Sequence, residues 1–387
     1  HYPFENKKKF EAGFPAEFIA EGQDQTRGWF YTLHVLATAL TRGKHPSIPK
    51  KVSCPAFNNV IVNGIVLAED GKKMSKRLQN YPDPMTVLEK YGADAMRYYL
   101  VSSPVMYAEN LNFSEEGVRE VFNKVVNTLW NVFTFYQMFS EKGLGTRDEG
   151  LETKNVLDRW SLAKLQFLVK DMTKSMNDYK LAEASRPIMD FVLELSQWYV
   201  RRSRDRFKGE DEADKQAALS TLHDVLLVLA KLMAPFTPFI AEKMFLELNN
   251  NTGSVHLESW PVVSEKLMDE KVLEDMAMAR KVVEESLALR KEAKIKVRQI
   301  LQYLMIDRDM PEDLKQIIAD EVNVKEILFG DKLELDTIIT LDLKKEGLSR
   351  EIIRAINQIR KEKGLTREKL VTVEYETNDE ELKKIFT

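Results

Sequence analysis

A lysine-rich loop after an apolar run is the feature that most constrains the fold of this chain. The run covers residues 60–67, and the charges of the loop are Lys72, Lys73, Lys76 and Arg77. Asp70 and Gly71 favour a turn at its start, and prolines after it keep a helix from beginning at once. A basic run of this kind is most often solvated surface. At the carboxyl end of a buried strand, however, it lies where an α/β protein binds its ligand, and lysine charges can follow phosphate oxygens there.

The segment before the run predicts the rest of a βαβ unit. Residues 18–20 are a short strand candidate, a polar turn follows at residues 21–25, and apolar residues then recur at helical spacing. These are Trp29, Phe30, Leu33, Leu36 and Leu40. Asp24 is placed to cap this helix, and the turn residues taken alone can be explained as turn and cap residues. Because parallel strands joined by a crossover end at one edge of a sheet, we expect residues 21–25 and the lysine loop to share a ligand.

The totals describe an ordinary folded protein. The 387 residues are 44% hydrophobic and 30% charged, enough for two or three domains with a large core. The net charge of −4 excludes a globally basic nucleic-acid binder but not a basic face. A single cysteine, Cys54, excludes an internal disulfide and a cysteine-cluster zinc site, which fits the cytoplasm. The sequence has no run of membrane-spanning length and no signal pattern. Since it opens on His1, we expect a piece of a longer protein.

Residues 114–248 are expected to form an antiparallel bundle of helices. Ser114 marks the start of the first helix. The apolar stripe after it is Val118, Val121, Val125, Leu129, Val132 and Tyr136. Later helices are predicted over residues 157–178, from Ser185-Arg186-Pro187 onward, up to Pro235, and over residues 237–248. Their inward positions include Ile188, Phe191, Leu195, Trp198 and Phe239.

One helix of this bundle ends in a dense group of cations. They are Arg201, Arg202, Arg204, Arg206 and Lys208. Cations at a helix C-terminus stabilise the helix dipole, so a structural role stays open beside phosphate binding.

The remainder is expected to be a small α+β domain. The predicted helices cover residues 270–291, 312–321 and 349–361, with a short one at the end. The predicted strands cover residues 295–306, 324–329, 333–343 and 370–376. A second basic cluster, which includes Lys294, Lys296 and Arg298, lies where the first of these strands begins, although exposed lysines on a strand are commonplace.

Two of these stretches resemble one family. Lys73-Met74-Ser75-Lys76-Arg77 resembles the Lys-Met-Ser-Lys-Ser signature of class I aminoacyl-tRNA synthetases, with Arg77 in place of the last serine. Residues 14–30 resemble the block typical of isoleucyl-tRNA synthetases, where valyl and leucyl relatives differ. The resemblance implies that this block lines the aminoacyl-adenylate through Glu21, Gly22, Asp24 and Gln25. It also implies ATP binding by the five loop residues, with Lys76 as the closest pyrophosphate contact, Lys73 assisting it as the second catalytic residue, and Ser75 holding the loop.

Five further stretches resemble the same family. Residues 91–97 and 108–113 are similar to the connector that follows its lysine signature. Residues 198–201 and 234–242 resemble its anticodon-binding domain. Residues 293–299 resemble its Ile-Lys-Val-Arg-Gln-Pro stretch, with Ile300 where proline is usual. The resemblance implies tRNA contacts by Trp198, Arg201, Arg202, Arg204, Arg206, Lys294, Lys296 and Arg298.

The resemblance implies a multidomain fold. A partial α/β domain with a Rossmann-like parallel sheet is expected over residues 1–113, an α-helical anticodon-binding bundle over residues 114–265, and the small α+β C-terminal domain over residues 266–387. The implied function is an isoleucine–tRNA ligase that uses ATP with Mg²⁺, isoleucine and the tRNA for isoleucine, as a cytoplasmic monomer with no membrane association and no zinc. Catalysis would be positioning plus charge stabilisation.

Two alternatives remain. The chain could be a stand-alone tRNA-binding or scaffold protein, or part of a valyl- or leucyl-type synthetase. The His-Ile-Gly-His signature and the editing insertion of the family are absent from this sequence. We therefore expect the chain alone to bind tRNA without activating isoleucine.

Overall fold

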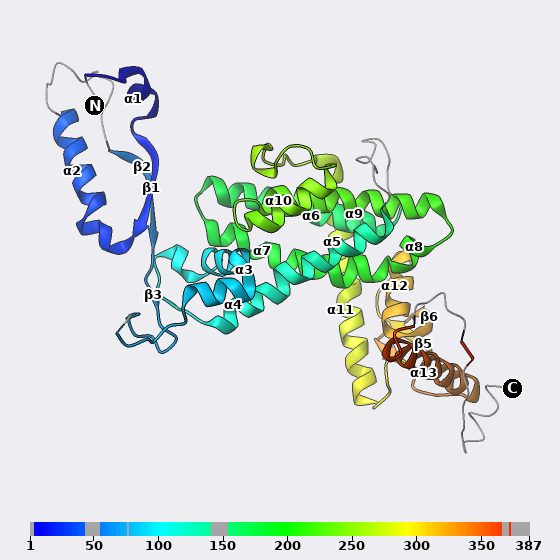
Figure 1. Cartoon of the computed structure of the whole chain (residues 1–387). Helices are drawn as coiled ribbons and strands as arrows, with labels where there is room; N and C mark the ends of the chain where they lie inside the picture. Colours follow the sequence, from blue (N-terminus) through cyan, green and yellow to red (C-terminus); the bar gives the residue numbers. More distant parts are fainter. Residues whose placement is uncertain (1–3, 43–54, 76, 141–153, 366–370, 373–387) are drawn as a thin grey trace. The chain divides into compact units, whose positions relative to one another are not determined.

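The structure is a computed structural model that describes residues 4–42, 55–75, 77–140, 154–365 and 371–372 (Figure 1). These residues form two compact units, 1–268 and 269–387. Most of the strand predicted at residues 370–376, and the helix predicted after it, lie outside the described residues.

The first unit opens with two strands joined by a helix. β1 (Ala16–Gly22) and β2 (Phe57–Asn63) pair in parallel, with Ile19 opposite Val60 and Gly22 opposite Asn63. α1 (Lys7–Gly13) precedes β1, and a 3-10 turn (Gln23–Arg27) and α2 (Trp29–Arg42) lie between the strands. The predicted parallel crossover is therefore confirmed. The apolar face of α2 is less buried than its helical spacing predicts. Phe30 is buried, whereas Leu36 and Leu40 are more than half exposed.

The strand predicted over residues 60–67 is wrong in its extent. β2 ends at Asn63, and a separate strand, β3 (Val66–Leu67), pairs in parallel with β4 (Leu111–Asn112). The ladder breaks at Gly64, where any side chain would overlap the carbonyl oxygen of Glu109. The lysine loop therefore follows the β3–β4 pair, whereas residues 21–25 follow the β1–β2 pair.

α3 (Pro84–Val101) leads from the lysine loop to the bundle. It contains a sharp kink at Gly92, whose φ of 82° and ψ of 160° suit glycine. The kink divides α3 into two halves on either side of Tyr91-Gly92. A 3-10 turn (Pro104–Tyr107) and β4 then return the chain to the side of β3.

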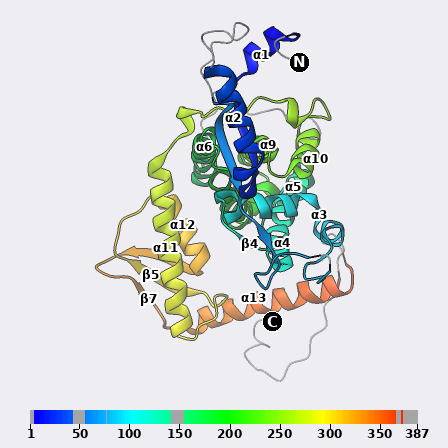
Figure 2. The same ribbon diagram turned by 90° about the vertical axis from the view of Figure 1, so that its left-hand side faces the viewer.

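The helices of the bundle lie side by side in both views of the molecule (Figures 1 and 2). They are α4 (Glu115–Val121), α5 (Thr128–Phe139), α6 (Val156–Asn177), α7 (Leu181–Glu194), α8 (Arg204–Lys208), α9 (Glu212–Met233) and α10 (Pro238–Leu248). The Ser114 hydroxyl accepts from the amide of Gly117, so Ser114 caps α4 as predicted. Every residue of the predicted stripe from Val118 to Tyr136 is buried. Of the described helices, α9 has the length and composition of a membrane span, and 61% of that stretch is buried inside the bundle.

Three details of the bundle differ from prediction. α7 begins at Leu181, so Pro187 lies inside the helix, where a proline removes one backbone hydrogen bond. A π-helical turn (Leu195–Val200) changes the register after α7, and Tyr199 rather than Trp198 is fully buried. Phe239 is 66% exposed, because its neighbour Ile240 faces the core at the start of α10.

The second unit has the predicted α+β character. Its elements are α11 (Glu270–Glu292), β5 (Leu301–Ile306), α12 (Glu312–Val322), β6 (Val324–Phe329), β7 (Glu334–Leu335) and α13 (Leu341–Glu362). The strand order is β6-β5-β7, with β5 parallel to β6 and antiparallel to β7. Two strand predictions are too long: residues 295–300 precede β5, and the predicted strand at 333–343 is reduced to β7. The Thr340 hydroxyl accepts from the amide of Leu343 and starts α13 eight residues before the predicted Ser349.

Candidate functional site

Asn80 organises the lysine loop. Its side-chain oxygen accepts from the Ser75 amide at 2.9 Å, and its side-chain nitrogen donates to the Lys73 carbonyl at 3.2 Å. Lys73 also forms a β-bridge with Leu67 at the start of the loop. The sequence pattern did not single out Asn80, although an asparagine after a turn often bonds nearby backbone in this way. The loop is thus closed at both ends by local contacts.

The charged side chains of the loop differ in their surroundings. Lys72 lies 2.9 Å from the carboxylate of Asp70, and this hydrogen bond raises the pKa of Lys72 and lowers that of Asp70. Lys73 and Arg77 are exposed, Met74 and Ser75 are half-buried, and Lys76 lies outside the described residues. In the part of the loop that the structure describes, Lys73 has no carboxylate within ion-pair distance and is the lysine available to an anion.

Replacing Asn80 with alanine should open the loop without unfolding the unit. Two hydrogen bonds are lost, each contributing about 0.5–1.5 kcal/mol, so amide hydrogen exchange in residues 73–79 should rise by roughly 5- to 150-fold. Asn59→Ala is the matched control, because the side-chain nitrogen of Asn59 donates to the Glu17 carbonyl in the β1–β2 pair, away from the loop. Equal exchange in the loop of both variants would contradict the assigned role of Asn80.

The carboxyl ends of β1 and β2 bring polar residues together. Gln25, not Asp24, caps α2, because the side-chain oxygen of Gln25 accepts from the Trp29 amide at 2.9 Å. The predicted Asp24 cap is therefore wrong. Asp24 and Glu21 are exposed at this edge, and Gly22 is half-buried. Carboxylates here remain able to accept hydrogen bonds from a ligand.

Asn63 is a further candidate that the sequence did not reveal. It ends β2 opposite Gly22, and its side-chain oxygen is buried with no hydrogen-bond partner in the described part of the chain. A buried acceptor without a partner is costly and marks a position where a ligand donor can bind. The residue was hidden by its place in the apolar run at residues 60–67.

The two predicted parts of the adenylate site are not joined by a polar contact in the described residues. Among the described residues, no hydrogen bond or ion pair joins residues 21–25 to Lys73, Met74 or Ser75, and the two segments follow different sheets. The described residues also hold no group of three or more His, Cys, Asp or Glu side chains placed to bind a metal ion.

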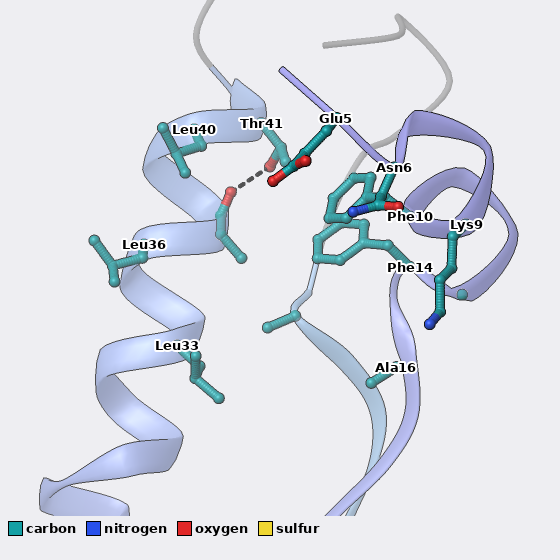
Figure 3. A pocket seen from close by; sticks show the side chains of 13 residues that line it. Glu5, Asn6, Lys9, Phe10, Phe14, Ala16, Leu33, Leu36, Leu40 and Thr41 are labelled. Atoms are coloured by element: carbon teal, nitrogen blue, oxygen red, sulfur yellow. Dashed lines mark hydrogen bonds between the residues drawn. The ribbon is translucent and has the colours of Figure 1, made fainter. Parts of the chain in front are cut away.

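A cavity in the described part of the first unit lies elsewhere. It measures about 650 Å³ between α1, β1 and α2, and its lining includes Leu33, Leu36 and Leu40 of α2 and the rings of Phe10 and Phe14 (Figure 3). Phe10 and Phe14 stack with their ring centroids 4.7 Å apart. The wall includes Ala16 and Ala56, which stand at the amino ends of β1 and β2. Ligands of parallel sheets bind at the carboxyl ends, so this cavity is not the predicted nucleotide site.

Arg206 is engaged within the bundle. Its guanidinium forms paired hydrogen bonds to the Asp158 carboxylate at 2.7 and 2.8 Å and also contacts Asp214 at 2.8–3.0 Å. The Asp158 side chain is fully buried and that of Arg206 is 12% exposed. Tyr199 donates to the same Asp158 oxygen at 2.8 Å. Burial lowers the pKa of Arg206, but its hydrogen bonds to the two carboxylates outweigh that effect and raise it above the ordinary value. This geometry differs from the predicted RNA contact of Arg206.

The other cations of this segment have different surroundings. Arg201, Arg204 and Lys208 are exposed, whereas Arg202 and Trp198 are half-buried. The segment therefore combines Arg206, which is held inside the bundle, with the exposed charges of Arg201, Arg204 and Lys208.

A buried arginine shapes the second basic cluster. Arg290 of α11 is 1% exposed and donates to the carbonyl oxygens of Lys296, Gln299 and Asn323 at 2.7–3.0 Å. Burial lowers its pKa to about 10. These bonds hold residues 293–299 as a turn instead of the predicted strand. The turn exposes Lys294, Lys296 and Arg298, and Lys296 pairs with Glu351 at 3.0 Å.

Comparison with known proteins supports both parts of this description. Residues 1–112 match the family "tRNA synthetases class I (I, L, M and V)", and residues 158–305 match "Anticodon-binding domain of tRNA ligase". An isoleucine–tRNA ligase of Chlamydia trachomatis serovar D is 48% identical over 345 residues, which is 85% of this chain and 32% of that protein. An isoleucine–tRNA ligase of Chlamydia abortus is 42% identical over 372 residues, 93% of this chain and 35% of that protein. The chain thus spans about a third of the length of the curated relatives it matches.

The fold agrees with a solved structure. The chain is similar to the LeuRS chain of the Agrobacterium radiobacter K84 agnB2 LeuRS-tRNA-LeuAMS ternary complex, with a TM-score of 0.52 and 22% identity over 66% of this chain and 29% of that one. The lysine loop, the helical bundle and the two family matches therefore lead to one conclusion: this chain belongs to the class I tRNA synthetases of the I, L, M and V group.

Proposed function

We propose that the protein containing this chain is an isoleucine–tRNA ligase, which activates isoleucine with ATP and transfers it to the tRNA for isoleucine. The observation that carries this proposal is the closed lysine loop, in which Asn80 fixes the backbone and Lys73 stays exposed while Lys72 is paired with Asp70. The choice of isoleucine is supported by the names of the relatives. The proposal keeps residues 1–113, 114–265 and 266–387 as the catalytic, anticodon-binding and C-terminal parts.

The chemistry requires little beyond charge and position. ATP enters with Mg²⁺ as part of the substrate, and the isoleucine carboxylate attacks the α-phosphate to release pyrophosphate. Lys76 and Lys73 stabilise the negative charge on the departing pyrophosphate. The half-buried Met74 and Ser75 and the exposed Arg77 complete the nucleotide-binding loop, in which Asn80 already holds the Ser75 amide. No covalent enzyme intermediate is needed.

The strand ends of β1 and β2 supply the other side of the adenylate site. Glu21 and Asp24 accept hydrogen bonds from ribose hydroxyls, and Gly22 lets the ligand approach the backbone. Gln25 offers its side-chain nitrogen, since its oxygen caps α2. Asn63 accepts one further hydrogen bond through its buried oxygen. Asn63 adds discrimination, because a ligand without a matching donor leaves its buried oxygen unsatisfied.

The RNA is bound by exposed cations of both units. Arg201 and Arg204 of the bundle, with the nearby Arg202 and Trp198, contact the RNA backbone. In the second unit, Lys294, Lys296 and Arg298 do the same from the turn that Arg290 holds. Such contacts position RNA without reading its sequence and weaken steeply with salt. In this proposal Arg206 supports the site through the bundle, and the protein works as a cytoplasmic monomer.

An amino-acid activation screen on the full-length protein tests the proposal. Exchange of pyrophosphate into ATP should depend on isoleucine, with valine roughly 10- to 200-fold less effective because one methylene separates the two side chains. A preference for valine or leucine would assign the protein to another member of the group. No exchange with any amino acid, together with tight tRNA binding, would instead indicate a stand-alone RNA-binding protein.

A further inference from the structure

Asp94 of α3 caps a helix of the bundle from outside. Its carboxylate is 7% exposed and accepts from the amides of Phe239 at 3.2 Å and Ile240 at 2.7 Å, in the first turn of α10. The residue at the N-cap position of α10, Thr237, makes no such side-chain bond. A carboxylate at this point satisfies two free amides and favours the positive end of the helix dipole. The start of α10 therefore depends on a side chain 145 positions earlier in the sequence.

Arg97 binds the end of the preceding helix. It donates from Nε to the Phe236 carbonyl at 3.3 Å and from Nη2 to the Pro235 carbonyl at 3.1 Å. These carbonyls directly follow α9, where a cation is favoured by the dipole. Asp94 and Arg97 lie three residues apart, hence on neighbouring positions of one helix face. Together they hold the turn between α9 and α10, and we call this pair the α3 clamp.

The same part of α3 also supports the entry to the lysine loop. Tyr99 accepts from the Ser114 amide at 3.2 Å through its hydroxyl, directly after β4. β4 pairs with β3, and the Phe113 amide donates to the carbonyl of Leu67 at 2.9 Å. Leu67 in turn bridges to Lys73. A continuous set of contacts thus runs from α3 to the lysine whose role is to meet the nucleotide.

The exit from the loop has its own attachment, which does not involve Asp94 or Arg97. The first half of α3 is fastened to α4, because Lys90 and Tyr91 both donate to the Glu115 carboxylate at 2.7 and 3.0 Å. Gly92 then interrupts the helix, and a Cβ placed there would meet nothing within 4 Å. The α9–α10 turn therefore reaches the loop through the second half of α3, Tyr99 and β4, and the kink at Gly92 separates this route from the attachment to α4.

We propose that Asp94 and Arg97 are positioning residues that couple the helical bundle to the lysine loop. The α3 clamp fixes the second half of α3 on the α9–α10 turn, and Tyr99 carries that position to β4, β3 and Lys73. This inference rests on the proposed function, in which the bundle binds RNA and the loop binds nucleotide. RNA bound to the bundle then shifts the position of the loop through the α3 clamp. Neither residue touches the substrate.

Hydrogen exchange on this chain tests the coupling without any need for activity. In Asp94→Asn, loss of the charged acceptor should raise exchange about 10-fold or more at residues 236–241 and also at residues 66–75. The matched control is Glu242→Gln on the same helix α10, whose carboxylate accepts from the Val255 amide at 2.8 Å. In the control the rise should be confined to residues near Val255. A rise confined to residues 236–241 in Asp94→Asn would overturn the coupling and leave Asp94 as a local cap.

A second pair of variants guards against simple misfolding. Arg97 is exposed, so Arg97→Met is expected to fold. This variant should raise hydrogen exchange at residues 66–75, as Asp94→Asn does. Arg97→Lys should restore part of the protection from exchange at these residues. In the full-length protein, Arg97→Met should lower tRNA charging about 10-fold while tRNA-free pyrophosphate exchange stays within about 3-fold of wild type. Equal losses in both reactions, or a loop unchanged in both Arg97 variants, would contradict the proposal. A wild-type protein without isoleucine-dependent exchange would refute the proposed function, whereas the hydrogen-exchange result would still decide on the clamp.

Discussion

Replacing Arg206 with methionine is expected to lower the free energy of unfolding by about 3–5 kcal/mol. The substitution removes both guanidinium hydrogen bonds from the Asp158 carboxylate, which is fully buried and keeps its hydrogen bond from Tyr199. An uncompensated buried charge is among the most destabilising changes a core can suffer. Urea denaturation followed by circular dichroism measures the loss, and hydrogen exchange in α6 and α9 locates it.

Arg204→Met is the matched control. Arg204 lies two residues away on the same short helix, and its side chain is exposed. The same substitution there should change stability by less than about 0.5 kcal/mol but should weaken tRNA binding. A cost below about 1 kcal/mol for Arg206→Met would mean that the ion pair is not structural. A loss of RNA affinity in Arg206→Met without a loss of stability would restore the phosphate contact predicted from the sequence.

Removing either signature lysine should abolish most of the activation of isoleucine. In the full-length protein, Lys76→Ala and Lys73→Ala are each expected to lower the rate of pyrophosphate exchange by roughly 10²- to 10³-fold, the usual effect of removing one preorganised donor. The reason is that each ammonium group stabilises charge that develops on the departing pyrophosphate. Exchange rates at saturating ATP separate this effect from weaker nucleotide binding.

Lys72→Ala provides the comparison within the same loop. Lys72 is already paired with Asp70 at 2.9 Å, and the pair is exposed. Its removal should change the exchange rate by less than about 3-fold, since exposed pairs contribute little. If Lys72→Ala reduced exchange as strongly as Lys76→Ala, simple positive charge on the loop would explain the activity, and the specific roles given to Lys73 and Lys76 would be wrong.

The sequence predicted those parts of the fold that depend on local periodicity. The stripe from Val118 to Tyr136 needed only helical spacing, and each of its members is buried. The cap at Ser114 could be predicted because a cap residue acts within a few positions of itself. The parallel pairing of β1 and β2 could be predicted from the order strand, helix, strand. The limits of these elements were less certain where π-helical turns shift the register, as at Trp198 and Tyr199.

Features that depend on distant partners could not be read from the sequence. Arg206 looked like its exposed neighbours until the fold placed it beside Asp158, 48 positions earlier. The break at Gly64 depends on Glu109, and the turn at residues 293–299 depends on carbonyl contacts with Arg290. Likewise, the sequence gives no sign that residues 91–97 and 234–242 are in contact. The structure shows that Asp94 and Arg97 bind residues 235–240.

The most direct test of the account is binding of this chain to the tRNAs for isoleucine and for valine at about 50 and 200 mM salt. We expect tight binding of both tRNAs, because backbone contacts do not read sequence. The affinity should fall by roughly 100-fold between the two salt concentrations, since about five exposed cations would each release counterions. The double variant Arg201→Gln/Arg204→Gln should show a shallower salt dependence. Absence of binding, or binding that salt does not weaken, would contradict the RNA-binding role given to the bundle and the turn.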